Sequence, residues 1–216
     1  MTQPKQKIVV LGTNSYSRVA AEIIDEIPNL QMAGFIENLD RSKCGRNHAG
    51  FPVYWIDDAE FLTTECHAVC CLATVHRGRF IEQARRIGFR FAAVIHPTAR
   101  VPASAVIGEG CLLEPGVILS TNTRLGAHVR VNRGVTIGHD TVVGDYCTIQ
   151  PGVNIAGKCC LGEGVYVGIG TTVIDNLSIG KLTVIGAGAV VICDLPEKVL
   201  AVGVPARIVK DNIEGK

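Results

Sequence analysis

The sequence predicts a small α/β domain followed by a parallel β-helix built from hexapeptide repeats. Between Val101 and Val191 an aliphatic residue recurs at every sixth position, sixteen times without a register slip. Before this stretch, short apolar runs alternate with segments whose apolar residues keep helical spacing. A six-residue period fits neither a helix nor a simple strand. It is typical of a β-helix in which three hexads close one coil of about 18 residues.

The repeat also predicts the interior of the β-helix. A small or branched residue follows each aliphatic residue after four positions, where the core of a coil is narrow. We therefore expect one continuous apolar column inside the coils. The column should consist of Val101, Ile107, Leu113, Leu119, Leu125, Val131, Ile137, Val143, Ile149, Ile155, Leu161, Val167, Val173, Ile179, Ile185 and Val191.

The N-terminal region is expected to form a small Rossmann-like parallel sheet, because its strands and helices alternate. The predicted strands are Lys7–Gly12, Gln31–Glu37, His67–Ala73 and Phe91–Ile95. The predicted helices cover 19–27 and Arg77–Ile87, with a short helix through Leu62 and a polar loop over 38–52.

These patterns divide the chain into three expected segments. The α/β domain covers residues 1–96, and the β-helix covers residues 97–195, because the hexads fail at Pro196. The tail over residues 196–216 is expected to turn and to end in a short helix.

The turn after the first strand is a place where doubly wound folds bind phosphate or nucleotide. Of the G-x-G-x-x-G pattern only Gly12 is present, which argues against a dinucleotide site. A nucleotide held by the backbone N–H groups of an open turn is still compatible with the sequence.

Composition excludes several partners and predicts the compartment. The formal net charge of +1 gives no reason to expect nucleic acid. The nine cysteines are an odd number, and three of them, Cys111, Cys147 and Cys159, stand at small inward positions. Neither a signal peptide core nor an apolar run of membrane-spanning length is found. We expect a cytoplasmic protein without disulfides that binds neither nucleic acid nor membrane.

One polar segment stands out from the otherwise apolar hexads and contains candidate catalytic residues. His139 follows the inward Ile137 by two residues, and Asp140 comes next. A histidine is the natural general base near neutral pH, and a nearby carboxylate raises its basicity. Gly157 lies one coil later, where it could expose a backbone N–H. These are parts that acyl transfer needs, although spacing alone fits a surface histidine on a corner equally well.

Four features together resemble one family: the hexads, the segment IGHDTVVGD, the tail GVPARIV and the N-terminal strand-turn-helix. The chain resembles the bacterial hexapeptide acetyltransferases of the sialic acid O-acetyltransferase and nucleotide-aminosugar N-acetyltransferase family over residues 6–210. The resemblance implies a left-handed β-helix, which departs from the usual right-handed crossover. It also implies a homotrimer with acetyl-CoA as co-substrate in the groove between neighbouring subunits.

The resemblance assigns roles to residues of the β-helix. His139 matches the general base, Asp140 the acidic residue that raises its basicity, Asn132 an active-site asparagine, and Gly157 the glycine whose amide faces the thioester oxygen. The positions that match acetyl-CoA contacts are Thr148, where a related enzyme has a histidine, Gly168, Ile169 and Ala187 along the pantetheine arm, and Pro205, Ala206 and Arg207 near the adenine end.

The resemblance also assigns acceptor-binding residues in the N-terminal domain. Asn14, Ser15 and Tyr16 align with a glycine- and histidine-containing turn of the family, from which this sequence departs. Glu37 and Asn38 match the pair that meets the base or ribose of a nucleotide, and Ala73 matches another nucleotide contact.

These matches predict an acetyl-CoA-dependent N-acetyltransferase that acts on the amine of a nucleotide-linked aminodeoxy sugar for surface glycan synthesis. Transfer to a hydroxyl, as in sialic acid O-acetylation, is equally compatible with the sequence. A γ-type zinc hydratase on the same fold needs three ligands, usually histidines, and the repeats contain only His128 and His139. We therefore expect no metal. A non-catalytic scaffold is a further alternative, against which the polar His-Asp segment argues.

Overall fold

The structure is a computed structural model that describes residues 4–216. The first three residues, which belong to the segment where no signal peptide was expected, lie outside this range. The chain divides into two compact units, and the boundary along the chain lies between Pro97 and Thr98, one residue after the predicted one. No helix within residues 4–216 has the length and apolar character that crossing a membrane requires.

The first unit is built on a sheet with the strand order β3-β4-β2-β1-β5-β6. All neighbours pair in parallel except β3 and β4, which form an antiparallel hairpin. The central strand β1 carries four fully buried residues in a row, Ile8 to Leu11, as expected for a parallel strand covered on both faces. The strands are β1 (Gln6–Leu11), β2 (Leu30–Glu37), β3 (Asn47–His48), β4 (Phe51–Trp55), β5 (Cys66–Cys70) and β6 (Arg90–Phe91).

Two helices accompany this sheet. Helix α1 (Ser15–Asp25) begins at Asn14, whose side chain accepts a hydrogen bond of 3.0 Å from the backbone N–H of Ser17. Helix α2 (Arg77–Ile87) has the predicted bounds and ends at Gly88, which adopts the left-handed conformation that terminates many helices.

Several predicted bounds in this unit differ from the structure. The expected loop over 38–52 contains a 3₁₀ turn, Arg41–Lys43, strand β3 and the start of strand β4. Strand β4 contains Pro52, and proline in a sequence argues against a strand. The expected short helix consists of two 3₁₀ turns, Ile56–Asp58 and Glu60–Leu62. The strand expected over Phe91–Ile95 is interrupted, so that β6 ends at Phe91 and β7 covers Val94–Ile95.

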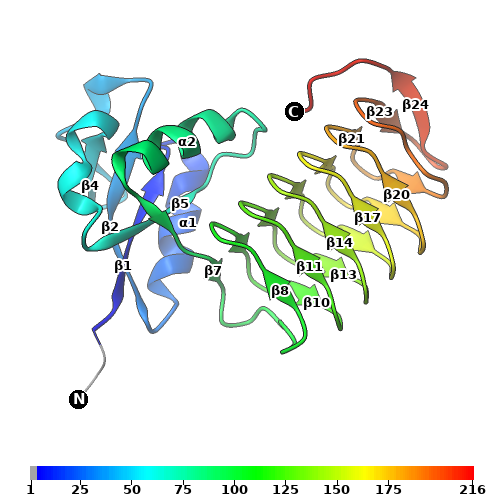
Figure 1. Cartoon of the computed structure of the whole chain (residues 1–216), viewed down its shortest axis with the longest axis horizontal. Helices are drawn as coiled ribbons and strands as arrows, with labels where there is room; N and C mark the ends of the chain where they lie inside the picture. The colour runs from blue at the N-terminus through cyan, green and yellow to red at the C-terminus, as the bar shows by residue number, and fades with distance from the viewer. Residues whose placement is uncertain (1–3) are drawn as a thin grey trace. The chain divides into compact units, whose positions relative to one another are not determined.

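The second unit is a β-helix whose coils follow one another from green to red in Figure 1. Each short strand pairs in parallel with the strand three hexads later, as in Arg124↔Val142 and Thr136↔Asn154. The predicted coil length is therefore confirmed. One sheet contains β8 (Val106–Ile107), β11 (Arg124–Leu125), β14 (Val142–Val143), β17 (Cys160–Leu161) and β20 (Ser178–Ile179).

The other two sheets complete the triangular section of the β-helix. The second contains β10 (Ile118–Leu119), β13 (Thr136–Ile137), β16 (Asn154–Ile155), β19 (Thr172–Val173) and β22 (Val190–Val191). The third contains β9 (Leu112–Leu113), β12 (Arg130–Val131), β15 (Thr148–Ile149), β18 (Tyr166–Val167) and β21 (Val184–Ile185).

The interior of the β-helix follows the sequence repeat. From Leu113 to Val191 every residue of the predicted aliphatic column is at most 3% exposed. Val101 and Ile107, in the first coil, are half-buried. The column fills the space between the three sheets and leaves the corners free to carry polar residues.

The tail contradicts one prediction. Residues Arg207–Lys210 form strand β24 and not a helix. This strand pairs antiparallel with β23 (Leu200–Val202), which itself continues the third sheet beyond β21. The open edge of β23 offers unpaired backbone N–H and C=O groups, and an extended tail satisfies them.

Candidate active site

The polar segment predicted from the sequence forms one corner of the β-helix. His139 follows β13, and its Nδ1 lies 2.8 Å from Oδ2 of Asp140. The side chains are 55% and 46% exposed. With the Nδ1 proton donated to the carboxylate, Nε2 is the ring nitrogen that can accept another proton. The pair therefore has the arrangement of a general base with its orienting carboxylate.

Asp140 is ionised at neutral pH. Hydrogen bonds from His139 and then from Asn122 hold the pKa of its carboxyl below the ordinary value, and these effects outweigh partial burial. Its negative charge can stabilise the positive charge that the imidazole gains when it takes a proton.

Gly157 lies against the imidazole from the next coil. A Cβ atom built on Gly157 would lie 2.7 Å from His139 Nε2, so only glycine leaves room for the ring. Within residues 4–216 the backbone N–H of Gly157 has no hydrogen-bond acceptor, and the residue is half-buried. A free N–H beside a basic nitrogen is what is needed to hold an oxyanion next to a proton acceptor.

Asn132 occupies another corner of the coil. It follows β12, is 3% exposed, and donates from Nδ2 to the carbonyl of Ile149 over 2.9 Å. His139 follows β13, so β13 separates the two residues along the coil. We call these corners the Asn132 corner, after strands β12, β15, β18 and β21, and the His139 corner, after strands β10, β13, β16, β19 and β22.

The three residues predicted to contact the pantetheine arm of acetyl-CoA lie at the Asn132 corner. Gly168 and Ile169 follow β18, and Ala187 follows β21. A Cβ atom on Gly168 would lie 2.6 Å from the backbone nitrogen of Ala187, so this glycine is required by close packing of successive coils. Ile169 is 57% exposed and presents an apolar side chain to solvent. Thr148 lies within β15 and is buried.

The predicted tail residues lie at the C-terminal end of the β-helix. Ala206 is buried, and its N–H donates to the carbonyl of Val190 over 2.8 Å. Pro205 and Arg207 beside it are exposed, and Arg207 Nη1 donates to the carbonyl of Ala206 over 3.0 Å. The tail is therefore anchored to β22 with an arginine at the surface.

In the first unit, the predicted acceptor residues follow the carboxyl ends of β1, β2 and β5. Strands β2 and β5 flank β1, so the chain crosses from one side of β1 to the other at this edge. Open α/β sheets bind ligands at such a switch point. Asn14 caps α1, Ser15 and Tyr16 form its first turn, and Ala73 lies exposed in the loop after β5.

Glu37 joins two of these turns. Its side chain is 5% exposed. Oε1 accepts from the backbone N–H groups of the next three residues, two of them at 2.9 and 2.8 Å, while Oε2 accepts from Thr13 and, at 3.3 Å, from Lys43. Burial alone would raise the pKa of Glu37, but the hydrogen bonds from Thr13 and the backbone and from Lys43 outweigh it and lower the pKa. Both carboxylate oxygens are thus used to shape the turns.

The hydrogen bonds of the Glu37 carboxylate predict a pH-dependent effect of Glu37→Gln on stability. The folded carboxyl has a depressed pKa, so its stabilisation is present above its ordinary pKa of 4.5 and is lost as the pH falls below that value. We expect Glu37→Gln to lower the free energy of unfolding by about 1.5–3 kcal/mol at pH 7. Denaturant titrations of both full-length proteins should show this difference shrinking below pH 4.5. A difference that stays constant down to pH 3 would contradict a stabilising role of the ionised Glu37 carboxylate.

A cavity of about 250 Å³ opens at the same edge of the sheet. It is lined by residues from the loop after β2, the loop after β5 and the start of α2. Its walls are apolar, and basic groups lie at the N-terminus of a helix. The residues that line it are Asn38, Leu39, Leu72, Thr74, His76, Arg77, Arg79 and Phe80.

Of the predicted acceptor residues, only Asn38 lines this cavity. Leu39, Thr74, His76, Arg77 and Arg79 were not predicted. The run of His76, Arg77 and Arg79 at the start of a predicted helix was the signal that could have identified them, since anions bind at such positions.

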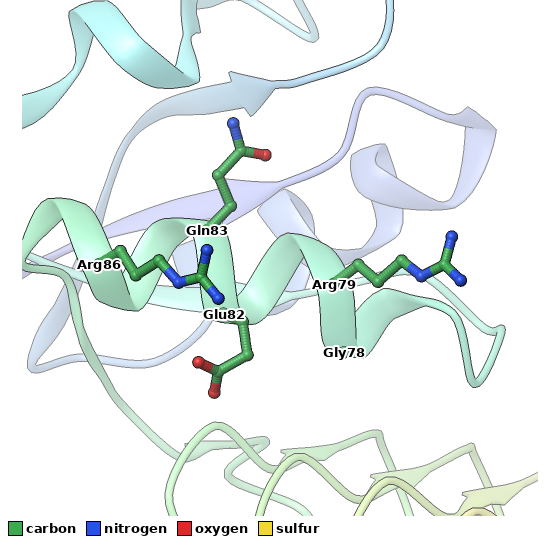
Figure 2. A pocket seen from close by; sticks show the side chains of 5 residues that line it. All are labelled: Gly78, Arg79, Glu82, Gln83 and Arg86. Carbon is green, nitrogen blue, oxygen red and sulfur yellow. The ribbon is translucent and has the colours of Figure 1, made fainter.

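A larger hollow of about 430 Å³ lies along α2, and Figure 2 shows the residues that line it. Gly78, Arg79, Glu82, Gln83 and Arg86 all belong to this one helix, and in Figure 2 Glu82 points away from the side to which Gln83 extends. Gln83 Oε1 accepts from Asn38 Nδ2 over 3.1 Å and so fixes a wall of the smaller cavity. The smaller cavity, enclosed by several elements, is the better candidate for an acceptor site.

The described part of the chain offers no ligand set for a metal. Residues 4–216 contain no group of three or more His, Cys, Asp or Glu side chains placed to hold an ion. His128, which the hydratase alternative would need, is 2% exposed and stacks on Tyr146, with ring centroids 5.4 Å apart. His128 is thus packed against an aromatic ring inside the structure.

Comparisons with known proteins identify the repeats that carry these residues. The family model "Bacterial transferase hexapeptide (six repeats)" matches residues 122–157, which include His139, Asp140 and Gly157. A search of curated protein sequences gave no match.

Three solved structures are similar over nearly the whole chain. PerB from Caulobacter crescentus, in complex with CoA and GDP-perosamine, is 30% identical, with 94% of this chain and 97% of that chain covered and a TM-score of 0.86. WeeI from Acinetobacter baumannii is 29% identical, with 94% and 99% covered and a TM-score of 0.83. The acetyltransferase domain of PglB from Neisseria gonorrhoeae is 26% identical, with 95% and 100% covered and a TM-score of 0.84.

The left-handed β-helix of hexapeptide repeats with its α/β domain, together with these similarities, defines the class of acetyl-CoA-dependent sugar acetyltransferases. Within that class, the chain belongs to the hexapeptide-repeat N-acetyltransferases of nucleotide-linked amino sugars. The predicted family, fold class, enzyme class and co-substrate are confirmed.

Proposed function

We propose that His139, Asp140 and Gly157 transfer an acetyl group from acetyl-CoA to the amine of a nucleotide-linked aminodeoxy sugar used in surface glycan synthesis. The closeness of Gly157 to the imidazole carries this proposal, because a Cβ atom on Gly157 would lie 2.7 Å from His139 Nε2 and the backbone N–H of Gly157 has no acceptor within residues 4–216. The amine nitrogen attacks the thioester carbonyl carbon and gives its proton to Nε2. Gly157 N–H donates to the oxyanion that forms.

Collapse of the tetrahedral intermediate breaks the carbon–sulfur bond. His139 then returns its proton to the thiolate, which gives free CoA and an amide. Asp140 keeps Nδ1 protonated throughout and stabilises the transient imidazolium. The chain thus supplies a base, its orienting carboxylate and an oxyanion donor.

The first unit would bind the acceptor and the second unit would perform the chemistry, with the tail over residues 196–216 at the adenine end of acetyl-CoA. The cavity between Asn38 and α2 supports this division, because His76 and Arg79 suit a diphosphate and the apolar wall of Leu39 and Leu72 suits a base. PerB, in complex with GDP-perosamine, supports a nucleotide-linked acceptor. The turn formed by Asn14, Ser15 and Tyr16, with Ala73, would frame the same edge.

The protein would act as a homotrimer with active sites between subunits. Within one chain, the base lies at the His139 corner, while Asn132, Gly168, Ile169 and Ala187 lie at the Asn132 corner. Packing the His139 corner of one subunit against the Asn132 corner of the next would bring the two sets together three times around an axis. All nine cysteines are free thiols, which supports the reducing cytoplasm as the compartment.

This assembly gives a direct prediction. Light scattering of the purified protein at micromolar concentration should give about three times the mass of one chain, because a single chain leaves the two corners apart. Addition of acetyl-CoA should not change that mass. A stable monomer that still acetylates its acceptor would contradict a site shared between subunits.

A turnover panel tests the function. The enzyme is mixed with acetyl-CoA and with GDP-, UDP- or dTDP-linked amino sugars, and CoA release and product mass are measured. We expect saturable N-acetylation with one nucleotide and none with matched sugars that carry a hydroxyl in place of the amine. Acetylation of the hydroxyl sugars alone would establish O-acetylation instead.

A further inference from the structure

Polar residues follow one another along the His139 corner from coil to coil, and the side chains of two of them, Asn122 and Asp140, are hydrogen-bonded. Asn122, Asp140, Lys158 and Asn176 stand at the same position of successive coils, and all four adopt the left-handed backbone conformation, with φ between 57° and 60°. Few residue types tolerate this conformation, and Asn and Asp are among them. The corner therefore presents one residue per coil in the same backbone conformation.

Asn122 reaches the catalytic pair through Asp140. Its Nδ2 donates to Asp140 Oδ1 over 3.0 Å, while Asp140 Oδ2 accepts from His139 Nδ1 over 2.8 Å. The backbone N–H of Asn122 donates in turn to Ser104 Oγ over 3.1 Å, and the backbone N–H of Asp140 donates to the carbonyl of Thr121 over 2.9 Å. Backbone and side chain of Asp140 are thus both tied to the preceding coil.

We propose that Asn122 is a positioning residue of the acetyl transfer. By donating to Oδ1 of Asp140 it fixes the orientation of the carboxylate, and Oδ2 then holds His139 in the tautomer that carries its proton on Nδ1. Asp140 is about half exposed and can otherwise rotate its carboxylate in solvent. A donor on Oδ1 leaves Oδ2 as the oxygen that faces Nδ1. The proton then stays on Nδ1, and Nε2 stays open toward Gly157. Orientation of a base by a partner one contact away is a general device of active sites.

This inference rests on the proposed role of His139, so the first measurement is independent of turnover. The full-length protein is labelled with ¹⁵N-histidine, and NMR spectra are recorded at alkaline pH, where imidazole is neutral. We expect wild-type His139 to carry its proton on Nδ1. In Asn122→Gly, which keeps the left-handed backbone without strain, the His139 signal should move toward the Nε2-protonated form.

Two further variants make the test specific. Asn122→Asp keeps the size and the backbone preference but replaces the donor by an acceptor, and it should move the tautomer in the same direction. Asn176→Gly is the matched control, because Asn176 has the same conformation at the same corner and its side chain donates to Asp175. This control should leave the His139 signal and the turnover unchanged.

A double-mutant cycle with Asp140→Gly then separates positioning from a structural effect on the corner. Asn122→Gly alone should lower kcat about three- to tenfold, a modest loss because the contact is exposed, with the KM for acetyl-CoA unchanged. In the Asp140→Gly background the same substitution should have no further effect, whereas a merely structural role would give additive losses. An unchanged His139 signal in both Asn122 variants overturns the inference. Normal turnover of His139→Ala overturns the proposed base instead.

Discussion

Substitution of His139 by alanine should lower kcat by about 10²–10⁴-fold, which is the usual contribution of a positioned general base. The imidazole is the proposed proton acceptor, and its atoms are the nearest to a Cβ atom built on Gly157. The melting temperature should barely change, because the side chain is 55% exposed and lies outside the aliphatic column. The assay is CoA release at saturating acceptor.

Two controls accompany this substitution. The affinity of His139→Ala for acetyl-CoA, measured by calorimetry, should match that of the wild type, since none of the residues predicted to bind the pantetheine arm or the adenine end is His139. Asp140→Asn should cost less activity than His139→Ala, because it keeps the imidazole and removes only the charge that stabilises the imidazolium. Near-normal turnover of His139→Ala would place the base elsewhere.

Substitution of Gly157 by alanine should be almost as damaging, although it adds a single methyl group. Its Cβ would lie 2.7 Å from Nε2 of His139, so the ring must swing away from the nitrogen that carries the open N–H. We expect a loss of kcat of about 10²–10⁴-fold, approaching that of His139→Ala. Because the clash is with the end of a flexible side chain, the fold should hold.

Gly138→Ala provides the contrast within the same corner. There a Cβ atom would lie 2.4 Å from the backbone of Ala156 and Gly157, atoms that cannot move without opening the coil. Thermal denaturation should therefore show a clear loss of stability for Gly138→Ala and almost none for Gly157→Ala. Full activity of Gly157→Ala would mean that Nε2 does not face this glycine during the reaction.

The β-helix could be predicted nearly residue by residue, because a strict period fixes which side chains are inward and which residues are neighbours. The same arithmetic placed Gly157 one coil above His139. It would also have found Asn122, which precedes Asp140 by one coil, but the contact depends on a side-chain orientation that a period does not carry. Helix α2 was predicted with its final bounds from the helical spacing of Phe80, Ala84 and Ile87, and in the structure the left-handed Gly88 ends it.

The acceptor side was less predictable, since it depends on loops. Pro52 concealed β4, and the tail strand β24 depends on a sheet edge that only the folded structure provides. Glu37 was expected to meet a nucleotide, yet both of its oxygens are held by neighbouring turns. The cavity lined by His76 and Arg79 arises from the convergence of separate segments at the edge of a sheet.

The uniform pairing of strands from successive coils also gives the β-helix a constant axial spacing. Each coil advances the structure by about 4.8 Å, the spacing of paired strands. In the proposed site the acetyl end of the co-substrate lies near Gly157 and the adenine end near Arg207, so the number of coils between them must match the fixed length of the pantetheine arm. Duplication or loss of one whole coil would preserve every other pairing while moving the two ends apart or together by that step. In the proposed site, the count of coils between Gly157 and Arg207 is therefore constrained by the co-substrate, because a coil more or less would move the thioester away from His139.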